Sequence, residues 1–497
     1  MAQAQRITPR AQDFSEWYND VIMQAELADY SPVRGCMVIR PLGYRIWELM
    51  QRALDDMFAA TGHRNAYFPV FIPMSFLAKE AEHVEGFAKE VALVTHTRLK
   101  ATGKTGAGAV AVDPSSALDE PLVVRPTSET IIYAMFAKWI QSYRDLPLLL
   151  NQWCNVVRWE LRTRLFLRTT EFLWQEGHTA HATEGEAEAE ARLILGIYRN
   201  FAEEWMAMPV LTGVKTDSEK FAGALRTYAM EALMQDNKGL QAGTTHNLGQ
   251  NFAKAFEVKY QTAAGALEHV WNTSWGVSTR LVGGLIMTHS DDNGLIAPPK
   301  LAPVQAVIVP IWKTDQERSQ VSGVGDQVKA ALSKAGIRVE LDLRDNLKPG
   351  AKYFEWEAKG VPLRLEIGPR DVAAGQVVAA RRTGGKSPMR LEGIVAAAPA
   401  ALQEIQAGLF ATAKQRREEH SLRGATKQQF LEFMKGSGGF AYAGFCGGGE
   451  CEAAIKAATG ATIRVLPDPE FRSPEAPKTC LWCDEPSVAE AVWAQAY

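Results

Sequence analysis

Residues 157–178, which read VRWELRTRLFLRTTEFLWQEGH, decide the fold of this chain together with residues 275–285, which read WGVSTRLVGGL. Each stretch holds one arginine in an unusual local frame, Arg158 in the first and Arg280 in the second. Arginine suits the binding of phosphate, because its rigid fork offers paired donors and keeps its charge. A lone arginine more often belongs to a weak surface ion pair. Two such forks on separate elements, however, can hold a triphosphate at both ends.

The residues around these two arginines sharpen that prediction. Arg158 and Glu160 lie two positions apart, so on a strand they would share one face. A cation for phosphate would then lie beside an acceptor for an amino group, as adenine with phosphate requires. Around Arg280, an apolar run with a strand-like start passes into Gly283 and Gly284, which predicts a strand that leads into a closely packed helix.

These residues carry a resemblance to a known family. Residues 158–178 resemble motif 2 of the class II aminoacyl-tRNA synthetases, and residues 276–284 resemble their motif 3. Residues 35–69 hold a helical apolar pattern followed by Tyr67-Phe68-Pro69, and they resemble the dimer-forming motif 1. Within class II, the chain is similar over essentially its whole length to the prolyl-tRNA synthetases of the archaeal and eukaryotic type.

The resemblance implies an α/β (α+β) fold in three parts. Residues 1–300 would form an antiparallel-sheet catalytic core with motifs 1, 2 and 3, residues 301–410 an α/β anticodon-binding domain, and residues 411–497 a small zinc-binding α/β domain. It also implies a homodimer that joins L-proline to tRNA(Pro) with ATP and Mg²⁺. Between motifs 2 and 3 the chain leaves room for little beyond helices and turns, so we expect no large editing insertion.

Two further segments bear on the choice of amino acid, residues 125–130 (RPTSET) and 241–252 (QAGTTHNLGQNF). Proline offers a secondary ammonium with only two N–H donors. Glu129 can accept from that ammonium with charge assistance, and the Thr127 hydroxyl can lie beside it. An N-cap for the apolar run that follows is the alternative role of this segment, and the two roles are compatible.

The resemblance assigns the remaining roles. It implies that Arg158 bridges the proline carboxylate and the α-phosphate, and that Arg158 and Arg280 are the catalytic cations. The proline pocket is implied to comprise Thr127, Glu129, Arg158, Phe172, Trp174, His178 and His246. The ATP site is implied to comprise Arg158, Glu160, Arg168, Thr169, Gln241, Thr244, Ser278 and Arg280, with Gln241 and Thr244 near the magnesium.

Three alternatives stay open at this point. A threonyl enzyme has a similar anticodon domain, but its family carries a zinc-ligating cysteine in the region of residues 127–129, where this chain has none. A seryl enzyme shares the Thr-x-Glu loop but begins with a coiled coil, for which residues 1–30 are too short. A non-catalytic paralogue that binds tRNA or an amino acid would be expected to have lost one of the site residues, and all are present.

Composition sets only broad bounds. The chain has 497 residues, 46% of them hydrophobic and 22% charged, with a formal net charge of -3, which gives no global argument for binding nucleic acid. Any RNA surface must therefore be a local basic patch. We recognise no apolar leader near the start and no 18-residue apolar span, so we expect a cytoplasmic protein with neither a membrane nor DNA as a partner.

Four of the six cysteines lie near the C-terminus, as Cys446, Cys451, Cys480 and Cys483. Two short-spaced pairs fit tetrahedral zinc, because each pair can form a tight knuckle around one ion. Four thiolates would leave no open position, which predicts a structural rather than a catalytic ion. A redox dithiol at the second pair is the alternative. The other two cysteines are expected to be packed core thiols.

The region after residue 300 reads as a separate domain. Residues 297–303 (APPKLAP) are rich in proline, which predicts a domain boundary. An apolar strand, a polar helix and an alternating strand follow, and this order predicts a parallel sheet. Residues 356–371 resemble the anticodon-binding domain of several class II families, in a locally basic region that suits RNA. Glu357, Arg364 and Arg370 are therefore weak candidates for reading anticodon bases, with a solvated sheet edge as the alternative.

The chain ends in an apolar tail, residues 491–497 (AVWAQAY). Such a tail is expected to dock, because apolar surface left in water forgoes about 25 cal/mol for each Å². Packing onto the zinc domain alone is one possibility. The resemblance implies another, in which the carboxylate of Tyr497 reaches toward the active site.

Overall fold

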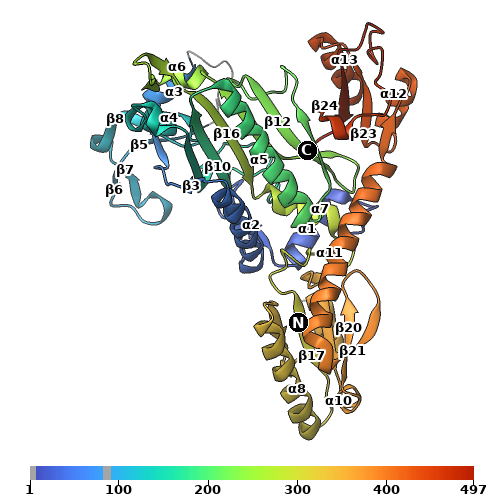
Figure 1. The fold of residues 1–497 in the computed structure, drawn as a ribbon. Coiled ribbons are helices and arrows are strands. Elements are labelled where there is room, and N and C mark those ends of the chain that lie inside the picture. The colour runs from blue at the N-terminus through green and yellow to red at the C-terminus, as the bar shows by residue number, and fades with distance from the viewer. Residues whose placement is uncertain (1–6, 82–90) are drawn as a thin grey trace.

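The structure is a computed structural model that describes residues 7–81 and 91–497 (Figure 1). Its central feature within the described residues is an 11-stranded sheet that runs through both the catalytic and the C-terminal regions. In sheet order, its strands are β22 (Ser421–Arg423), β23 (Phe440–Phe445), β25 (Ala489–Ala494), β24 (Thr462–Pro467), β11 (Val210–Val214), β12 (Arg226–Leu233), β13 (Gly239–Gly249), β16 (Trp271–Ser278), β10 (Glu171–His181), β9 (Leu148–Val157) and β3 (Arg64–Asn65). The strands from β11 to β9 pair antiparallel, as the resemblance to the class II synthetases implies.

Long helices pack on this sheet and build the main core. Helix α5 (Glu184–Glu204) begins with a capping box in which Thr183 and Glu186 exchange hydrogen bonds, and it lies across the sheet in Figure 1. Helix α2 (Pro41–Ala60) confirms the apolar pattern in residues 35–69. Helices α1 (Phe14–Gln24) and α7 (Arg280–His289) complete this layer.

The passage from β16 into α7 confirms the predicted strand followed by a closely packed helix. A Cβ added at Gly283 would lie 2.5 Å from Leu167 Cδ2 and 2.8 Å from the Tyr18 hydroxyl. Only glycine lets α7 approach these side chains so closely. Arg280 is thereby fixed at the first position of the helix, beside the segment that carries Leu167.

A smaller layer caps one end of the sheet. It contains β4 (Phe71–Pro73), β8 (Ala117–Val124) and β5 (Ala92–His96) in one sheet, the hairpin of β6 (Leu99–Ala101) and β7 (Val110–Val112), and helices α3 (Met74–Ala81), α4 (Glu129–Trp139) and α6 (Asn251–Ala255). The N-terminus of α4 faces the central sheet and brings residues 127–129 to it. Two-stranded pairs are also formed by β1 (Ala28–Tyr30) with β2 (Met37–Ile39) and by β14 (Lys259–Gln261) with β15 (Leu267–His269).

Residues after 300 form a separate five-stranded sheet, at the bottom of Figure 1. Its order is β18 (Val339–Leu341), β17 (Ala306–Pro310), β19 (Leu363–Ile367), β20 (Gln376–Arg381) and β21 (Lys386–Arg390). The pair β17–β18 is parallel and is connected through α8 (Asp315–Lys334), as predicted, and β17 also pairs parallel with β19. The sheet as a whole is mixed rather than parallel, because β20 pairs antiparallel with both β19 and β21. Two shorter helices, α9 (Pro349–Ala358) and α10 (Pro369–Ala373), complete this domain.

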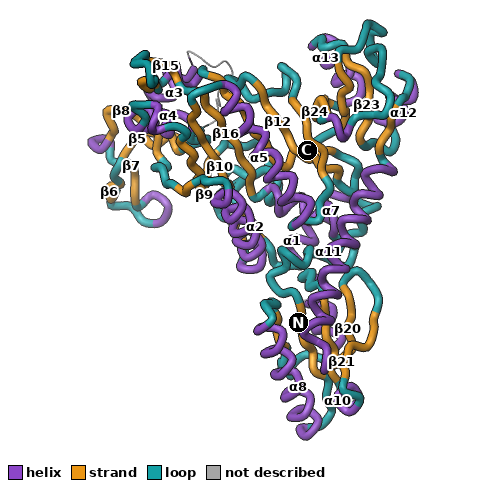
Figure 2. The backbone as a smooth tube through the Cα atoms, in the orientation of Figure 1, coloured by secondary structure: helices purple, strands orange, loops and turns teal. Residues whose placement is uncertain are grey.

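Helix α11 (Ile394–Glu419) runs from this domain to the C-terminal region (Figure 2). Within Leu391–Glu419, which includes the turn before the helix, an 18-residue window has a mean hydropathy of 1.3, so by length and composition alone this segment could cross a membrane. The expectation that the chain lacks an 18-residue apolar span is therefore wrong by this measure. The value reflects many alanines, and Ala398, Leu402 and Ile405 on this helix are buried in the protein interior.

The C-terminal region joins the catalytic sheet edge to edge, since β24 pairs antiparallel with β11. Gly213 lies opposite Pro467 in this pair, and a Cβ at Gly213 would come within 2.2 Å of the Leu466 carbonyl oxygen. The two regions thus share one continuous sheet. Helices α12 (Lys427–Lys435) and α13 (Gly449–Thr459) flank the C-terminal strands.

Candidate active site

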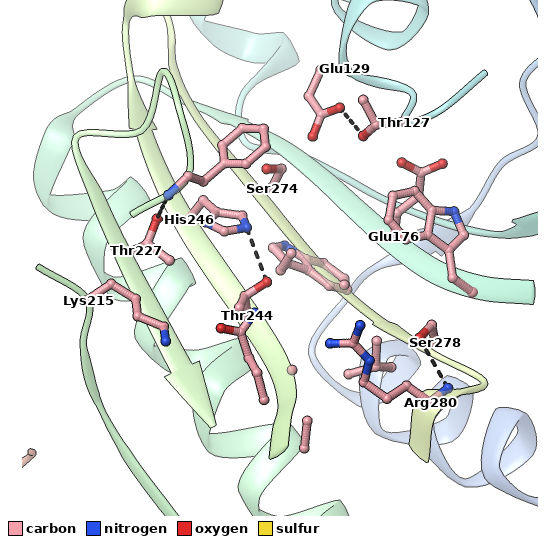
Figure 3. Close-up of a pocket in the computed structure, with 18 of the residues that line it drawn as sticks. Thr127, Glu129, Glu176, Lys215, Thr227, Thr244, His246, Ser274, Ser278 and Arg280 are labelled. Atoms are coloured by element: carbon pink, nitrogen blue, oxygen red, sulfur yellow. Dashed lines mark hydrogen bonds between the residues drawn. The ribbon is translucent and has the colours of Figure 1, made fainter. Parts of the chain in front are cut away.

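One cavity of about 310 Å³ lies over the middle strands of the catalytic sheet (Figure 3). Its walls come from the start of α4, from β10, β13 and β16, and from the segment between β11 and β12. The predicted residues that line it are Thr127, Glu129, Arg158, Phe172, Trp174, His178, Gln241, Thr244, His246, Ser278 and Arg280. The fold therefore brings together residues from four separate parts of the sequence.

Thr127 and Glu129 lie side by side at one end of the cavity, where the Thr127 hydroxyl donates to a Glu129 carboxylate oxygen. Both residues are more than nine-tenths buried, at 9% and 5% exposure. Ser128 occupies the N-cap position of α4, but its side chain makes no capping hydrogen bond and donates to Glu176 instead. This segment therefore supplies polar groups to the cavity while it begins the helix.

Glu176 and His178 follow on the same face of β10. His178 Nε2 lies 2.9 Å from one Glu176 oxygen, and the other oxygen accepts from Ser128 and, at 2.9 Å, from Gln152. Burial opposes charge on both groups, yet their mutual hydrogen bond and attraction lower the pKa of Glu176 and raise the pKa of His178. The pair is therefore an internal ion pair in the cavity wall.

Arg158 corrects one local expectation. It does not share a strand with Glu160, because β9 ends at Val157. Its backbone N–H still bonds the Thr170 carbonyl at 2.8 Å, but its side chain turns to the Pro126 carbonyl, 2.9 Å from Nε. The guanidinium also lies over the Trp174 ring, 5.3 Å from the centroid. The Arg158 guanidinium is therefore held by the Pro126 carbonyl and the Trp174 ring, and not by the pairing of a strand.

A second hollow of about 50 Å³ adjoins the main cavity. It is lined by Arg158, Glu160, Phe166, Leu167, Arg168, Thr169, Phe172, Ser278 and Arg280. Arg168 Nε lies 4.0 Å from Glu160, and the backbones of Arg164 and Arg168 bond to each other in a tight hairpin. Arg158 and Glu160 thus meet in one hollow although the strand does not align them.

Arg280 is anchored at the shared border of the two hollows. Its backbone N–H bonds the Ser278 hydroxyl at 3.2 Å, and its Nε donates to the Leu167 carbonyl at 3.1 Å. The remaining guanidinium nitrogens face the cavity in Figure 3. Arg280 and Arg158 therefore frame a space between them, as the sequence predicts for a triphosphate.

His246 is held between two threonines. Its Nδ1 lies 2.9 Å from the Thr227 hydroxyl and its Nε2 3.2 Å from the Thr244 hydroxyl. The Phe221 ring packs against it at 4.7 Å between centroids. Burial, with a smaller effect from the charge of His178, lowers the pKa of His246 to about 3. His246 is thus a neutral, oriented hydrogen-bonding group.

Several lining residues were not among the predicted site residues. These are Glu176, Lys215, Glu219, Lys220, Phe221, Thr227, Ala242, Gly243, Ser274, Trp275, Gly276 and Val277. Glu176 lies inside the motif 2 stretch and could have been found from its two-residue spacing to His178. Phe221 and Lys215 lie on a connection between strands, and no local pattern marks them.

The four C-terminal cysteines converge on one point. Their sulfur atoms all lie within 4.8 Å of one another, at the ends of β23 and α13 and in the loop before β25. Zinc–sulfur bonds of about 2.3 Å place tetrahedral thiolates about 3.8 Å apart, so this arrangement fits a zinc ion after a small contraction. Cys451 and Cys480 are buried, whereas Cys483 is exposed.

The candidate anticodon residues divide into two sets. Glu357 and Arg364 line a cavity of about 240 Å³ in the second domain, but Arg370 lies outside it. Arg364 also donates to Glu366 at 3.1 Å and covers the Tyr353 ring at 4.2 Å. An internal ion pair thus engages this guanidinium.

The C-terminal tail reaches the catalytic core. Val492 and Trp493 are fully buried in the C-terminal domain, while Tyr497 packs against the main core cluster. Gly239, the first residue of β13, donates to the Gln495 carbonyl at 2.8 Å and accepts from the Tyr497 N–H at 3.3 Å. The Tyr497 ring lies 5.6 Å from the Arg164 guanidinium. The tail therefore packs on both regions, and it does so at the strand that carries Gln241 and Thr244.

Comparisons with known proteins agree with this architecture. Residues 112–289 match the tRNA synthetase class II core domain (G, H, P, S and T), and residues 305–399 match an anticodon binding domain. Residues 428–497 match the C-terminal domain of prolyl-tRNA synthetase, which decides against the threonyl alternative.

Relatives of known function cover the whole chain. The proline–tRNA ligase of Porphyromonas gingivalis is 55% identical over 492 residues, 99% of each chain. That of Prosthecochloris aestuarii is 54% identical over 500 residues, covering 99% of this chain and 100% of the relative. A crystal structure of prolyl-tRNA synthetase from Cryptosporidium parvum, complexed with halofuginone and AMPPNP, matches with a TM-score of 0.90 at 38% identity over 99% of both chains. The chain therefore belongs to the prolyl-tRNA synthetases, the class II enzymes that ligate proline to tRNA.

Proposed function

We propose that the cavity over the catalytic sheet activates L-proline with ATP to prolyl-adenylate and then transfers proline to the 3′ end of tRNA(Pro). The observation that carries this proposal is the convergence of Thr127, Glu129, Arg158 and Arg280 on one cavity. An acidic acceptor with a hydroxyl at one end suits a zwitterion. Arg158, beside Pro126, and Arg280, farther along the cavity, suit a carboxylate and a chain of phosphates.

The proline ammonium would meet Glu129 and Thr127. Because Thr127 already orients the Glu129 carboxylate, this acceptor is preorganised. Phe172, Trp174 and His178 would surround the ring and exclude water, which strengthens each polar contact in the pocket. The neutral His246 would close the pocket from β13.

ATP would lie across the two adjoining hollows. Glu160 would accept from the adenine amino group, and Arg168, with Arg280, would hold the outer phosphates. Thr169 and Ser278 line the smaller hollow between these groups. Gln241 and Thr244 offer neutral oxygen atoms as possible metal ligands. Mg²⁺ takes most of its ligands from phosphates and water, so a few neutral protein ligands are enough for it. When bound, Mg²⁺ would neutralise phosphate charge.

The chemistry needs positioning rather than a general base. The proline carboxylate is already an anion, so its oxygen can attack the α-phosphorus in line as the bond to pyrophosphate breaks. Arg158 and Arg280 would stabilise the charge that grows on the phosphoryl oxygens. In the second step, a hydroxyl of the terminal tRNA ribose attacks the prolyl carbonyl carbon, and AMP leaves.

Amino-acid-dependent exchange of pyrophosphate into ATP tests this proposal. Proline should support exchange well above threonine, serine and alanine. Arg158→Ala and Arg280→Ala should each remove about 3 kcal/mol of transition-state stabilisation, or roughly a 100-fold rate. A wild-type protein that exchanges best with threonine would overturn the assignment of the pocket.

We further infer that the enzyme is of the archaeal and eukaryotic type and lacks an editing domain between motifs 2 and 3. In support, α5, β11 and β12 between β10 and β13 all belong to the catalytic sheet or pack on it. A small pocket rejects a substrate smaller by one methylene by only about 1 to 3 kcal/mol. Alanine should therefore be activated measurably, and alanyl-tRNA should persist in the presence of enzyme. Rapid enzyme-dependent deacylation would refute this inference.

We also propose a homodimer, an anticodon site and a structural zinc ion. Large apolar side chains remain exposed around motif 1, namely Val38, Tyr44, Tyr67 and Phe71, which suits a homodimer interface. The cavity lined by Glu357 and Arg364 suits anticodon bases, and Arg370, outside this cavity, is exposed and could meet phosphate. We propose a cytoplasmic enzyme with one structural zinc ion per chain. Sedimentation and metal analysis of the purified protein test the dimer and the zinc.

A further inference from the structure

A buried set of three charged residues connects the C-terminal domain to the active-site cavity. Lys215 Nζ lies 3.1 Å from one oxygen of Glu231, and Arg464 holds the same carboxylate with two nitrogens at 2.9 and 3.1 Å. The side chains of Lys215, Glu231 and Arg464 are only 2%, 0% and 8% exposed. Arg464 comes from β24 of the C-terminal domain, whereas the other two come from the catalytic region.

The charges in this set do not cancel. One carboxylate faces two cations, and the paired nitrogens of Arg464 bond both of its oxygens. Had Lys215 been alone with Glu231, the two charges would have neutralised each other. Because Arg464 shares the carboxylate, the set carries one net positive charge when both cations are protonated, in an interior where a charge is costly unless it is paired.

That net charge borders the cavity. Lys215 is one of its lining residues, and its side chain extends toward the strand with Thr244 (Figure 3). Glu231 lies directly opposite Gln241 in the pairing of β12 with β13. The set therefore lies behind the part of β13 proposed for the phosphates, away from Thr127 and Glu129 at the proline end.

Two nearby groups bear on this assignment. Burial lowers the pKa of Arg280 most, but the charges of Glu231 and Arg464 also act on it. The set thus lies within electrostatic reach of the motif 3 arginine. Burial, and to a smaller extent the charge of Arg464, lowers the pKa of Lys215, while Glu231 and Glu219, which also lines the cavity, act to raise it.

We propose that Lys215 binds the phosphate chain of ATP, and that Arg464 is a positioning residue by which the C-terminal domain holds the Glu231 carboxylate that anchors Lys215. This inference rests on the proposed function, because it takes ATP as the ligand of the cavity. The C-terminal domain is then a part of the ATP site. Its attachment through β11 and β24 fixes Arg464 at Glu231.

Three variants of the full-length enzyme separate this role from a purely structural one. Lys215→Met and Arg464→Gln each leave Glu231 with one cation, so neither strands a bare buried carboxylate. Arg464→Lys restores the second cation without the fork. Glu470→Gln serves as the matched control, since it removes another domain-crossing ion pair, Arg199–Glu470 at 2.7 Å, outside the cavity.

Lys215→Met and Arg464→Gln should each weaken ATP binding, measured by calorimetry, and lower kcat/KM for ATP in pyrophosphate exchange by about 10- to 100-fold. The KM for proline should stay unchanged. Arg464→Lys should recover most of the loss, and Glu470→Gln should behave as wild type. Thermal unfolding of each variant checks that the fold is retained.

Three results would overturn the proposal: folded Lys215→Met or Arg464→Gln with wild-type ATP affinity, equal losses in Arg464→Lys and Arg464→Gln, or a rise in the proline KM as large as that for ATP. Failure of the proposed function is seen separately. In that case the wild-type enzyme itself would show no proline-dependent exchange, before any variant is compared.

Discussion

His178 Nε2 lies 2.9 Å from a carboxylate oxygen of Glu176, and the two side chains are 2% and 3% exposed in the wall of the cavity. The residues are two positions apart on β10, so their side chains share one face. Ser128 and Gln152 hold the second carboxylate oxygen. An ion pair of this kind fixes the pocket wall, and its strength depends on pH.

We expect the Glu176–His178 pair to make stability depend on pH. A raised folded-state pKa of His178 adds stability that is complete below its unfolded value near 6.5 and is lost as pH rises through the folded value. The lowered pKa of Glu176 adds stability above its usual 4.5, which is lost as pH falls through the folded value. The difference in thermal midpoint between wild type and Glu176→Gln should therefore be largest between pH 4.5 and pH 6.5, where both contributions are complete. A difference that does not vary with pH would contradict the ion pair.

His246 is expected to stay neutral throughout catalysis. Because burial lowers its pKa to about 3, it should not titrate over roughly pH 5 to 8, the range in which an ordinary histidine does. The pH profile of kcat/KM for proline should thus keep the same apparent pKa values in His246→Gln, although the rate falls with the lost hydrogen bonds to Thr227 and Thr244. Disappearance of one limb of the wild-type profile in this variant would show that His246 ionises after all.

The sequence predicts the catalytic core well where one short segment carries both the structural and the chemical signal. Arg280 is such a case, because the apolar strand before it and the glycines after it fix its position at the start of α7. Thr127 and Glu129 are another, since helix initiation and the polar cavity wall involve the same residues. The strand–helix–strand pattern after residue 300 also predicts the parallel pair β17–β18, although it does not predict the antiparallel strands β20 and β21 of the same sheet.

Contacts between distant segments escape this reasoning. Arg158 and Glu160 suggest a shared strand face, but the Pro126 carbonyl and the Trp174 ring hold Arg158 in a loop. The Lys215–Glu231–Arg464 set spans two regions, and no spacing in the sequence relates its members. Continuity of the catalytic sheet into β24 likewise depends on a close approach at Gly213, which becomes visible only with the partner strand in place.

The four-cysteine cluster predicts about one zinc ion per chain. Because a structural ion contributes directly to the stability of a small domain, chelation should lower the unfolding midpoint of the C-terminal region. Cys480→Ser should lose the metal, since Cys480 is buried at the centre of the cluster. Metal analysis by mass spectrometry, with Cys36→Ser as the control, checks both expectations. A metal-free wild type that remains stable and active would show the cluster to be a remnant.

Deletion of Tyr497 is expected to impair proline activation without unfolding the C-terminal domain. The bond from Gly239 N–H to the Gln495 carbonyl remains in the deletion, and Trp493 stays buried in its own domain, so the tail keeps its main anchors. What is lost is the ring beside Arg164, at the base of the hairpin that carries Arg168, and the terminal carboxylate moves back to Ala496, away from the donors near the cavity that we expect it to meet. Tyr497→Phe keeps both the ring and the carboxylate and should behave as wild type. Zinc content and the unfolding midpoint should match in all three proteins, while the deletion alone lowers kcat/KM in pyrophosphate exchange. Wild-type kinetics in the deletion would reduce the role of the tail to packing.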